Sequence, residues 1–245
     1  MQRTPPPPRT RSAPEPGSVL VLAPHPIDEL VGLGGTLALH AEQHDRVHVI
    51  VAFEDAERDS NGSKGSRGSH EAELRSERRR SEALQGGARI GVSDYEFWDY
   101  PEGREPTPEE LFFAARLFAQ RICELQPRTL YAPWIGEQRQ AHHTLARAAL
   151  LALEIAEREL VAWGYEVWTP LAATCVIDIT PVWERKQRAI EAHTSLLGRG
   201  DLAHRALGLN AQRSAWLGGG ARYGEAFCPL RPTAAGSKTR EGRAA

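Results

Sequence analysis

The chain has 245 residues, of which 41% are hydrophobic and 25% are charged, and its net charge is −2. This near-neutral balance gives no electrostatic reason to expect nucleic acid or an anionic membrane as a partner. No apolar run approaches the roughly 20 residues that cross a bilayer, and the three cysteines lack the spacing of a zinc ribbon. We therefore expect a cytoplasmic protein, and the sequence leaves its oligomeric state open.

The two ends of the chain differ in composition from the rest. Residues 1–17 are rich in proline and lack the apolar stretch of a secretory signal, which predicts a disordered tail. Residues 231–245 are mostly small or charged and predict a flexible C-terminal tail. Because no linker or internal repeat interrupts residues 18–230, they are expected to form one domain.

The regular elements follow one another in a simple order. Residues 18–24 are a short β-branched run that predicts a strand buried on both faces, and apolar residues at helical spacing predict a helix over 28–43. The same patterns predict further strands over 47–53, 95–98, 129–133 and 172–179, and helices over 71–89, 107–125, 140–163, 181–197 and 201–216. Strand and helix alternate through the first two thirds, which is typical of a single α/β domain with a doubly wound, mostly parallel sheet flanked by helices.

The first candidate site residues lie where the first strand gives way to a helix. His25 stands between Pro24 and Pro26, and Asp28 opens the expected helix. Ligands of open parallel sheets bind at the carboxyl ends of the strands, and the prolines stiffen the turn that carries the imidazole. This pattern indicates either two metal ligands or a helix start with a capping carboxylate.

The second part of the site follows the expected strand over 129–133. His142 falls in the first turn of the next helix, where the helix dipole disfavours the imidazolium form and leaves a nitrogen lone pair free for a metal. His143 would point away and is expected on the helix face. Two histidines and one aspartate leave a coordination position for water, as in catalytic metal sites.

These motifs together resemble the LmbE/PIG-L family of metal-dependent N-deacetylases. The family's first signature reads His-Pro-Asp-Asp-Glu and its second roughly His-Pro-Asp-His, while this chain has His25-Pro26-Ile27-Asp28-Glu29 and Arg139-Gln140-Ala141-His142. The segments that also resemble the family are Glu57, Arg79 with Glu82, Asp99-Tyr100-Pro101-Glu102-Gly103, Arg185-Lys186, His193-Thr194-Ser195 and Arg222 to Phe227. The resemblance covers about residues 18 to 230.

The resemblance implies a fold and a chemistry. It implies a Rossmann-like sheet, and His25, Asp28 and His142 as ligands of Zn²⁺ or another divalent metal. It also implies a small-molecule substrate, an N-acylated amino sugar or glycoconjugate, with Arg79 and Asp99 as substrate-binding residues. The ion would activate water for attack on the amide.

The departures from the family pattern concern proton transfer. The family assigns the general base to the position that Ile27 occupies here, and isoleucine accepts no proton. Arg139 replaces a family histidine; it would stabilise an oxyanion or be an ordinary surface residue. Glu57 and Asp55 are the candidate replacement bases, although Glu57 also fits a solvated loop carboxylate.

Two functions follow from this pattern. The first is a zinc-dependent hydrolase that removes an acyl group, with Glu57 and Arg139 as catalytic residues. The second is a catalytically silent relative that binds a metal and a small polar ligand. Independently of this choice, Arg79 fits either a contact with the substrate at the rim of the site or a solvated helix face.

Overall fold

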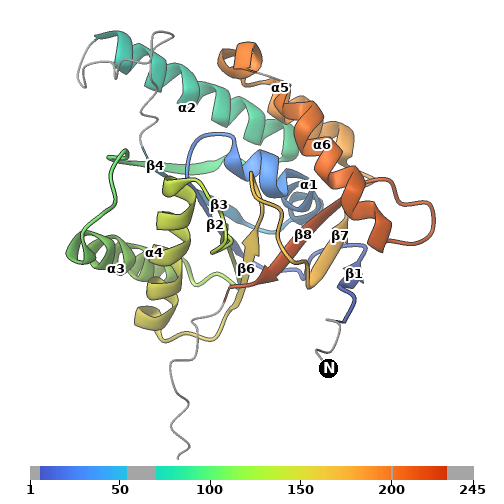
Figure 1. Cartoon of the computed structure of the whole chain (residues 1–245), viewed down its shortest axis with the longest axis horizontal. Coiled ribbons are helices and arrows are strands. Elements are labelled where there is room, and N and C mark those ends of the chain that lie inside the picture. Colours follow the sequence, from blue (N-terminus) through green and yellow to red (C-terminus); the bar gives the residue numbers. More distant parts are fainter. Residues whose placement is uncertain (1–5, 54–69, 200, 231–245) are drawn as a thin grey trace, which may run out of the picture.

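An eight-stranded sheet organises the chain (Figure 1). The computed structural model describes residues 6–53, 70–199 and 201–230. The strands are β1 (Arg9–Arg11), β2 (Val19–Ala23), β3 (Val47–Phe53), β4 (Asp94–Tyr100), β5 (Thr129–Pro133), β6 (Val161–Tyr165), β7 (Cys175–Asp178) and β8 (Gly224–Pro229). The helices are α1 (Asp28–Glu42), α2 (His70–Ile90), α3 (Pro108–Leu125), α4 (Gln140–Ala156), α5 (Trp183–Glu191) and α6 (Leu202–Arg213), with short 3-10 turns at Thr194–Arg199 and Ser214–Trp216.

The strand order contains a switch point beside β2, where successive strands are added first on one side of β2 and then on the other. The order is β1-β7-β8-β6-β5-β2-β3-β4, and every pairing is parallel except those of β8. The chain runs from β2 to β3 and β4 on one side, and then continues with β5 on the other side of β2. Ligands of doubly wound sheets bind at the carboxyl ends of the strands at such a switch point. The predicted α/β fold class is therefore confirmed, and the switch lies between β2 and β5.

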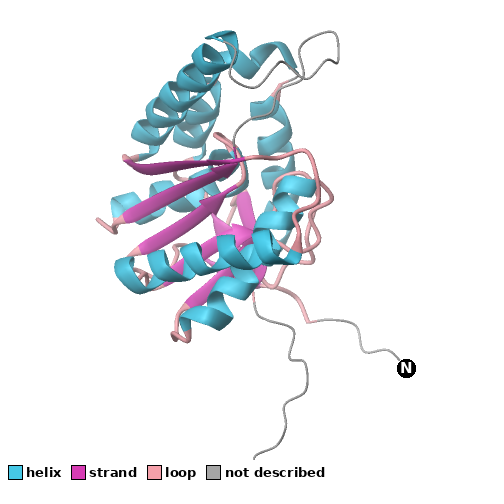
Figure 2. Ribbon diagram, turned by 90° about the vertical axis from the view of Figure 1, so that its left-hand side faces the viewer, coloured by secondary structure: helices cyan, strands magenta, loops and turns pink. Residues whose placement is uncertain are grey.

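Helices cover both faces of the sheet (Figure 2). Helices α1, α2, α5 and α6 pack over one face, where they share a hydrophobic core with alternate residues of β2 and β3. Helices α3 and α4 pack over the other face, on a second core that includes Leu20, Leu22 and Ile50. None of the helices in the described residues combines the length and apolar character that a membrane span requires.

Three expectations about the elements are wrong. The helix expected over 140–163 ends at Ala156, because Glu157 takes a left-handed conformation, and residues 161–165 form β6. The apolar and aromatic run of β6 pairs with both β5 and β8, so sheet pairing outweighs the helical pattern. The segment 224–229, which the sequence left without an element, forms β8. Within the expected tail 1–17, residues 9–11 form β1 and pair with β7.

Close packing of α1 on the sheet depends on Gly32. A Cβ atom at this position would lie 2.4 Å from Cδ2 of Tyr165, a residue of β6. The Tyr165 ring is fully buried, and its hydroxyl donates a hydrogen bond to the carbonyl oxygen of Leu22 at 2.9 Å. The glycine thus lets the helix that follows β2 lie directly against the strands beside the switch point.

Candidate metal and active site

The turn from β2 into α1 brings two of the expected ligands together. The backbone N–H of Asp28 donates to the carbonyl oxygen of His25 at 3.2 Å, and the N–H of His25 donates to Asp28 Oδ2 at 3.0 Å. His25 Nδ1 lies 3.1 Å from the same carboxylate oxygen. The turn therefore folds the imidazole of His25 back onto the first residue of the helix.

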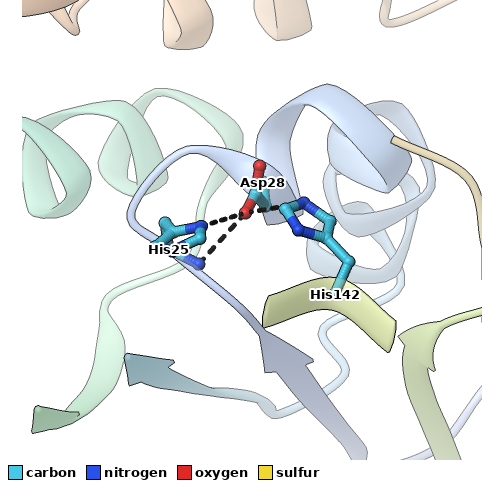
Figure 3. A group of neighbouring side chains, drawn as sticks. All are labelled: His25, Asp28 and His142. Carbon is cyan, nitrogen blue, oxygen red and sulfur yellow. Dashed lines mark hydrogen bonds and ion pairs between the residues drawn. The ribbon is translucent and has the colours of Figure 1, made fainter. Parts of the chain in front are cut away.

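His142 completes the group from the other side of the switch point. It lies in the first turn of α4, and its Nε2 is 3.2 Å from Asp28 Oδ2. Figure 3 shows the Asp28 carboxylate between the two imidazole rings, whose centroids are 5.6 Å apart. The predicted convergence of His25, Asp28 and His142 is what the structure shows.

The donor set fits a divalent cation. One ligand atom from each of the three residues lies within 4.8 Å of the others. His142 is fully buried, yet neither of its ring nitrogens has a hydrogen-bond partner among the described residues. Its Nε2 instead faces the Asp28 carboxylate as an ion-pair contact, and a buried imidazole grouped with a carboxylate and a second imidazole is the donor set of a catalytic metal site.

Electrostatics favour the charged forms of Asp28 and His25. Burial opposes ionisation of Asp28, but the adjacent imidazoles, first His142 and then His25, keep its pKa well below the usual value. Burial would likewise lower the pKa of His25, but the carboxylates of Asp28 and Glu102 outweigh it and raise the pKa to about 9. The pocket thus stabilises positive charge between carboxylates, which is also the charge that a cation would bring.

Glu102 holds the outer side of His25. Its Oε2 lies 2.5 Å from His25 Nε2, while the other ring nitrogen faces Asp28. A carboxylate that accepts a hydrogen bond from the second ring nitrogen fixes the tautomer and orientation of a ligating histidine. The geometry therefore leaves Nδ1 of His25 as the nitrogen directed at the ligand group.

Ile27 occupies an unusual backbone conformation at the family's base position. Its φ of 102° lies in the left-handed region, which is rare for a β-branched residue and costs about 1–3 kcal/mol. The N–H of Ile27 donates to the carboxylate of Glu29 at 3.1 Å, and Tyr95 donates its hydroxyl to the same carboxylate at 3.2 Å. The side chain of Ile27 is only 4% exposed and belongs to the core on the α1 face. Core packing of the Ile27 side chain and the hydrogen bond from its N–H to Glu29 thus stabilise this backbone conformation.

A large chamber opens beside the ligands, between α3, α4 and residues 100–106. Its volume is about 930 Å³. Its polar lining residues are His25, Glu102, Arg104, Glu109, Glu110, Arg139, Gln140, His142 and Thr144, and its apolar lining residues include Phe53, Tyr100, Leu111, Phe113, Ala114, Phe118, Leu145 and Ala148. The size lies near the upper end of the range for small-molecule sites.

Arg139 is one of the polar residues that line this chamber. It is the residue that precedes α4, and its guanidinium lies 3.7 Å from the centre of the Trp168 ring. Such cation–π stacking fixes the orientation of a guanidinium. A positive charge held beside the ligand group suits negative charge that develops on a carbonyl oxygen.

Other predicted site residues lie elsewhere. Asp99 forms an ion pair with Arg80, and neither Asp99 nor Arg79 lines the chamber, so their contact with substrate stays a prediction. The ring of His143 pairs through Nδ1 with the carbonyl oxygen of Ile135, as expected for a residue outside the ligand group.

The two candidate bases have no described environment. Glu57 and Asp55 lie outside the described residues. Their role as proton acceptors is therefore a prediction from the sequence.

Sequence reasoning missed the contact of Glu102 with His25, whereas it did single out the segment of His193. Glu102 belongs to a segment that resembles the family, but its contact with His25 joins residues 77 positions apart. No local sequence pattern indicates such a contact. His193 is 1% exposed, and neither ring nitrogen has a hydrogen-bond partner among the described residues. Burial lowers the pKa of His193 to about 4. The family resemblance placed its segment near the site, and the charges of Glu82, Arg79 and Asp28 reach it.

Solved structures with the same fold include both hydratases and deacetylases. GalB, the 4-carboxy-2-hydroxymuconate hydratase of Pseudomonas putida, superposes with a TM-score of 0.73 at 22% identity over 89% of this chain and 97% of GalB. The conserved protein TT1542 of Thermus thermophilus gives 0.69 at 23% identity over 88% and 95%. The N,N'-diacetylchitobiose deacetylase of Pyrococcus horikoshii gives 0.68 at 19% identity over 87% and 84%.

The sequence comparison identifies the family. The sequence has no significant match among curated proteins. The family model described as PIG-L, GlcNAc-PI de-N-acetylase, matches residues 20–153, a stretch that contains all three ligands and more than half of the chain. The chain therefore belongs to the PIG-L family.

Proposed function

We propose that the chain is a metal-dependent deacylase that hydrolyses the amide of an N-acylated amino sugar or a related small molecule. The observation that carries this proposal is the group of His25, Asp28 and His142, two of which, His25 and His142, line a substrate-sized chamber. Membership of a family named for a de-N-acetylase supports the amide substrate. The deacetylase of Pyrococcus horikoshii, which shares the fold, points to the same chemistry.

We assign Zn²⁺ or a similar divalent ion to the three ligands. Imidazole and carboxylate ligands suit zinc, and they also accommodate iron, cobalt or manganese. When bound, the ion supplies Lewis acidity, which polarises an amide carbonyl and acidifies water. Binding of the ion would displace a proton from His25, so that His25 and His142 would provide neutral nitrogens and Asp28 a negative charge.

The surrounding residues have separate roles in this proposal. Arg139, stacked on Trp168, stabilises the negative charge that develops on the carbonyl oxygen. Arginine is a poor proton donor because its pKa exceeds 12, so Arg139 does not protonate the departing amine. Glu57, with Asp55 as the alternative, accepts the proton of the attacking water. Glu102 keeps His25 in the ligating orientation.

A second candidate function rests on Ile27. The side chain at the family's base position is apolar and buried in the core, and it does not line the chamber. A chain without a proton acceptor would bind metal and ligand with little turnover, because a general base contributes about 10²- to 10⁴-fold to rate. The hydratase GalB shares the fold, so the fold does not decide between these functions.

Metal loading tests the ligand assignment. The chain is stripped with a chelator and reloaded with Zn²⁺, Mn²⁺ or Co²⁺, and its metal content and release of amine from N-acetylglucosamine are measured. We expect about one ion per chain, with both metal and activity lost in His142→Ala. His143→Ala is the matched control, because His143 contacts Ile135 instead of the ligand group. A native chain that binds no metal would contradict both candidate functions.

Substitution of Ile27 decides between the two functions. In Ile27→Asp, a residue that tolerates the left-handed conformation better also restores a carboxylate at the family's base position. If the native chain is active and Glu57→Gln abolishes that activity, the relocated base is supported. Turnover by Ile27→Asp alone would instead establish the silent relative.

A further inference from the structure

The chamber is far larger than an acetyl group needs. It occupies about 930 Å³ between α3 and α4, whereas an acetyl group adds only one methyl to the amide carbonyl. Sites of roughly 300–1,000 Å³ hold ligands of drug size. An acetyl group would therefore leave most of this volume to the rest of the substrate or to water.

The candidate metal ligands and a set of apolar side chains line the same chamber. His25 and His142 belong to its wall, and Leu145 and Ala148 follow on successive turns of α4. Helix α3 lines the opposite side with Phe113 and other apolar residues. A carbonyl held at the ligand group would therefore have an apolar channel next to its carbon.

The chemistry of an N-acylated amino sugar identifies which part of it enters this channel. Sugar hydroxyl groups that are buried against apolar side chains lose their hydrogen bonds to water, at a cost of about 1–3 kcal/mol each. A hydrocarbon chain gains from the same surroundings. The acyl group is therefore the part of the substrate that the lining accommodates.

We propose that the chamber between α3 and α4 is an acyl-chain site, and that the preferred substrates carry an aliphatic acyl group of several methylenes on the amine. This inference rests on the proposed deacylase function. In the reaction, the water oxygen joins the acyl carbon and the C–N bond breaks. A water proton passes to the amine nitrogen, giving a free amine and a fatty acid. The chamber holds the chain while the bond is cleaved.

A chain-length series tests the proposal. The metal-loaded full chain is assayed with N-acetyl-, N-butanoyl-, N-hexanoyl-, N-octanoyl- and N-decanoylglucosamine, and kcat/KM is measured from amine release. We expect kcat/KM to rise about threefold to fourfold for each added methylene until the chamber is filled. Activity that is highest on the acetyl compound would overturn the acyl-chain site and leave the deacylase function intact. No activity on any member would instead overturn the deacylase function.

The octyl glycoside of N-acetylglucosamine separates two positions of an alkyl chain. It carries its chain on the sugar, away from the reacting amide. We expect it to react no faster than N-acetylglucosamine. A large gain with this glycoside and none with the N-octanoyl compound would assign the chamber to the other end of the substrate and overturn the proposal.

Two neighbouring phenylalanines of α3 provide a matched pair of variants. Phe113 lines the chamber and is 60% exposed, whereas Phe112 is 51% exposed and does not line it. We expect Phe113→Ala to lower the octanoyl-to-acetyl ratio of kcat/KM by about threefold to tenfold, because part of the chain loses its apolar contact. Phe112→Ala should leave both rates unchanged. Equal effects of the two variants on this ratio would contradict a specific acyl-chain site. Circular dichroism of both variants serves as the control for correct folding.

Discussion

The helical layer of α1, α2, α5 and α6 buries charged groups, whereas the core beneath α3 and α4 is apolar. On the first face, Lys186 and Glu225 form an ion pair with no exposed surface, and Arg213 forms a bidentate pair with Glu166. On the second face, apolar residues of α3 and α4 pack on the strands and line the chamber. The candidate metal site lies between these two environments.

The buried ion pair has a structural cause in α1. The helix is kinked at Leu33, and Glu225 accepts hydrogen bonds from the N–H groups of Gly35 and Thr36 beyond the kink, at 2.8 and 2.7 Å. Lys186 donates to Glu225 at 2.7 Å and also to the carbonyl oxygen of Val31 at 2.8 Å. Strand β8 and helix α5 thereby satisfy the groups that the kink exposes.

The difference between the faces suggests a division of roles. Directional hydrogen bonds on the charged face hold α1, whose first residue is Asp28, in one position. Apolar contacts on the other face have no such direction and adapt to chains of different length. The structure therefore separates the group that holds the metal from the surface that would select the substrate.

The largest expected effect comes from breaking the buried ion pair. Lys186→Met should lower the free energy of unfolding by about 3–5 kcal/mol, because it leaves the fully buried carboxyl group of Glu225 without its cationic partner. Chemical denaturation followed by circular dichroism measures this value. The double variant Lys186→Met/Glu225→Gln removes both charges and should be more stable than Lys186→Met. A double variant that is less stable than the single one would show that the charge of Glu225 is not the cause.

A slightly smaller effect should appear as acid sensitivity of the same face. Burial lowers the pKa of His193 from 6.5 to about 4, so the unfolded chain binds more protons between these values. The free energy of unfolding therefore has its full value above pH 6.5. It decreases by about 3 kcal/mol as the pH falls toward 4 and below.

Unfolding measured from pH 4 to pH 8 in the native chain and in His193→Asn tests this loss. The variant should show a correspondingly smaller decrease, whatever its stability at pH 8. The charged groups facing His193, which both proteins share, are Glu82, Arg79, Asp28 and Arg89. Parallel curves for the two proteins would rule out His193 as the source.

Sequence reasoning predicted the convergence of the three candidate ligands because their signal is local. His25 and Asp28 follow β2 directly, His142 follows β5 by a short loop, and the carboxyl ends of adjacent parallel strands meet at one edge. The strand–helix alternation likewise predicted the sheet class. These features depend on residues close together in the sequence.

The features that were missed depend on distant contacts. Strand β8 lies between β6 and β7, and its antiparallel pairings join residues 46 to 66 positions apart. The contact between Glu102 and His25 and the volume between α3 and α4 also arise only when the chain is folded. The residue types at these positions carry no periodic signal, so the chamber could not be predicted.

A smaller effect is expected where the two environments meet, at Glu102. Glu102→Gln should weaken metal binding by about 10- to 100-fold, because the carboxylate that orients His25 loses its charge. A competition assay with a chelating dye measures the metal Kd, and kcat at saturating metal separates a positioning role from a direct one. Glu109→Gln is the matched control, since Glu109 lines the same chamber. An unchanged metal Kd in Glu102→Gln would remove Glu102 from the site.

The smallest expected effect concerns the chamber wall alone. Helix α3 begins with a capping box, in which Glu110 N–H donates to Thr107 Oγ1 at 3.3 Å and Thr107 N–H donates to the Glu110 carboxylate at 2.9 Å. Thr107→Ala should cost about 1 kcal/mol and raise amide hydrogen exchange in the first turn of α3. Thr107→Ser keeps the hydroxyl and should restore protection. Because these capping contacts stay within α3, exchange in α1 should not change. If exchange in α1 rose together with that in α3, the two faces would not be independent.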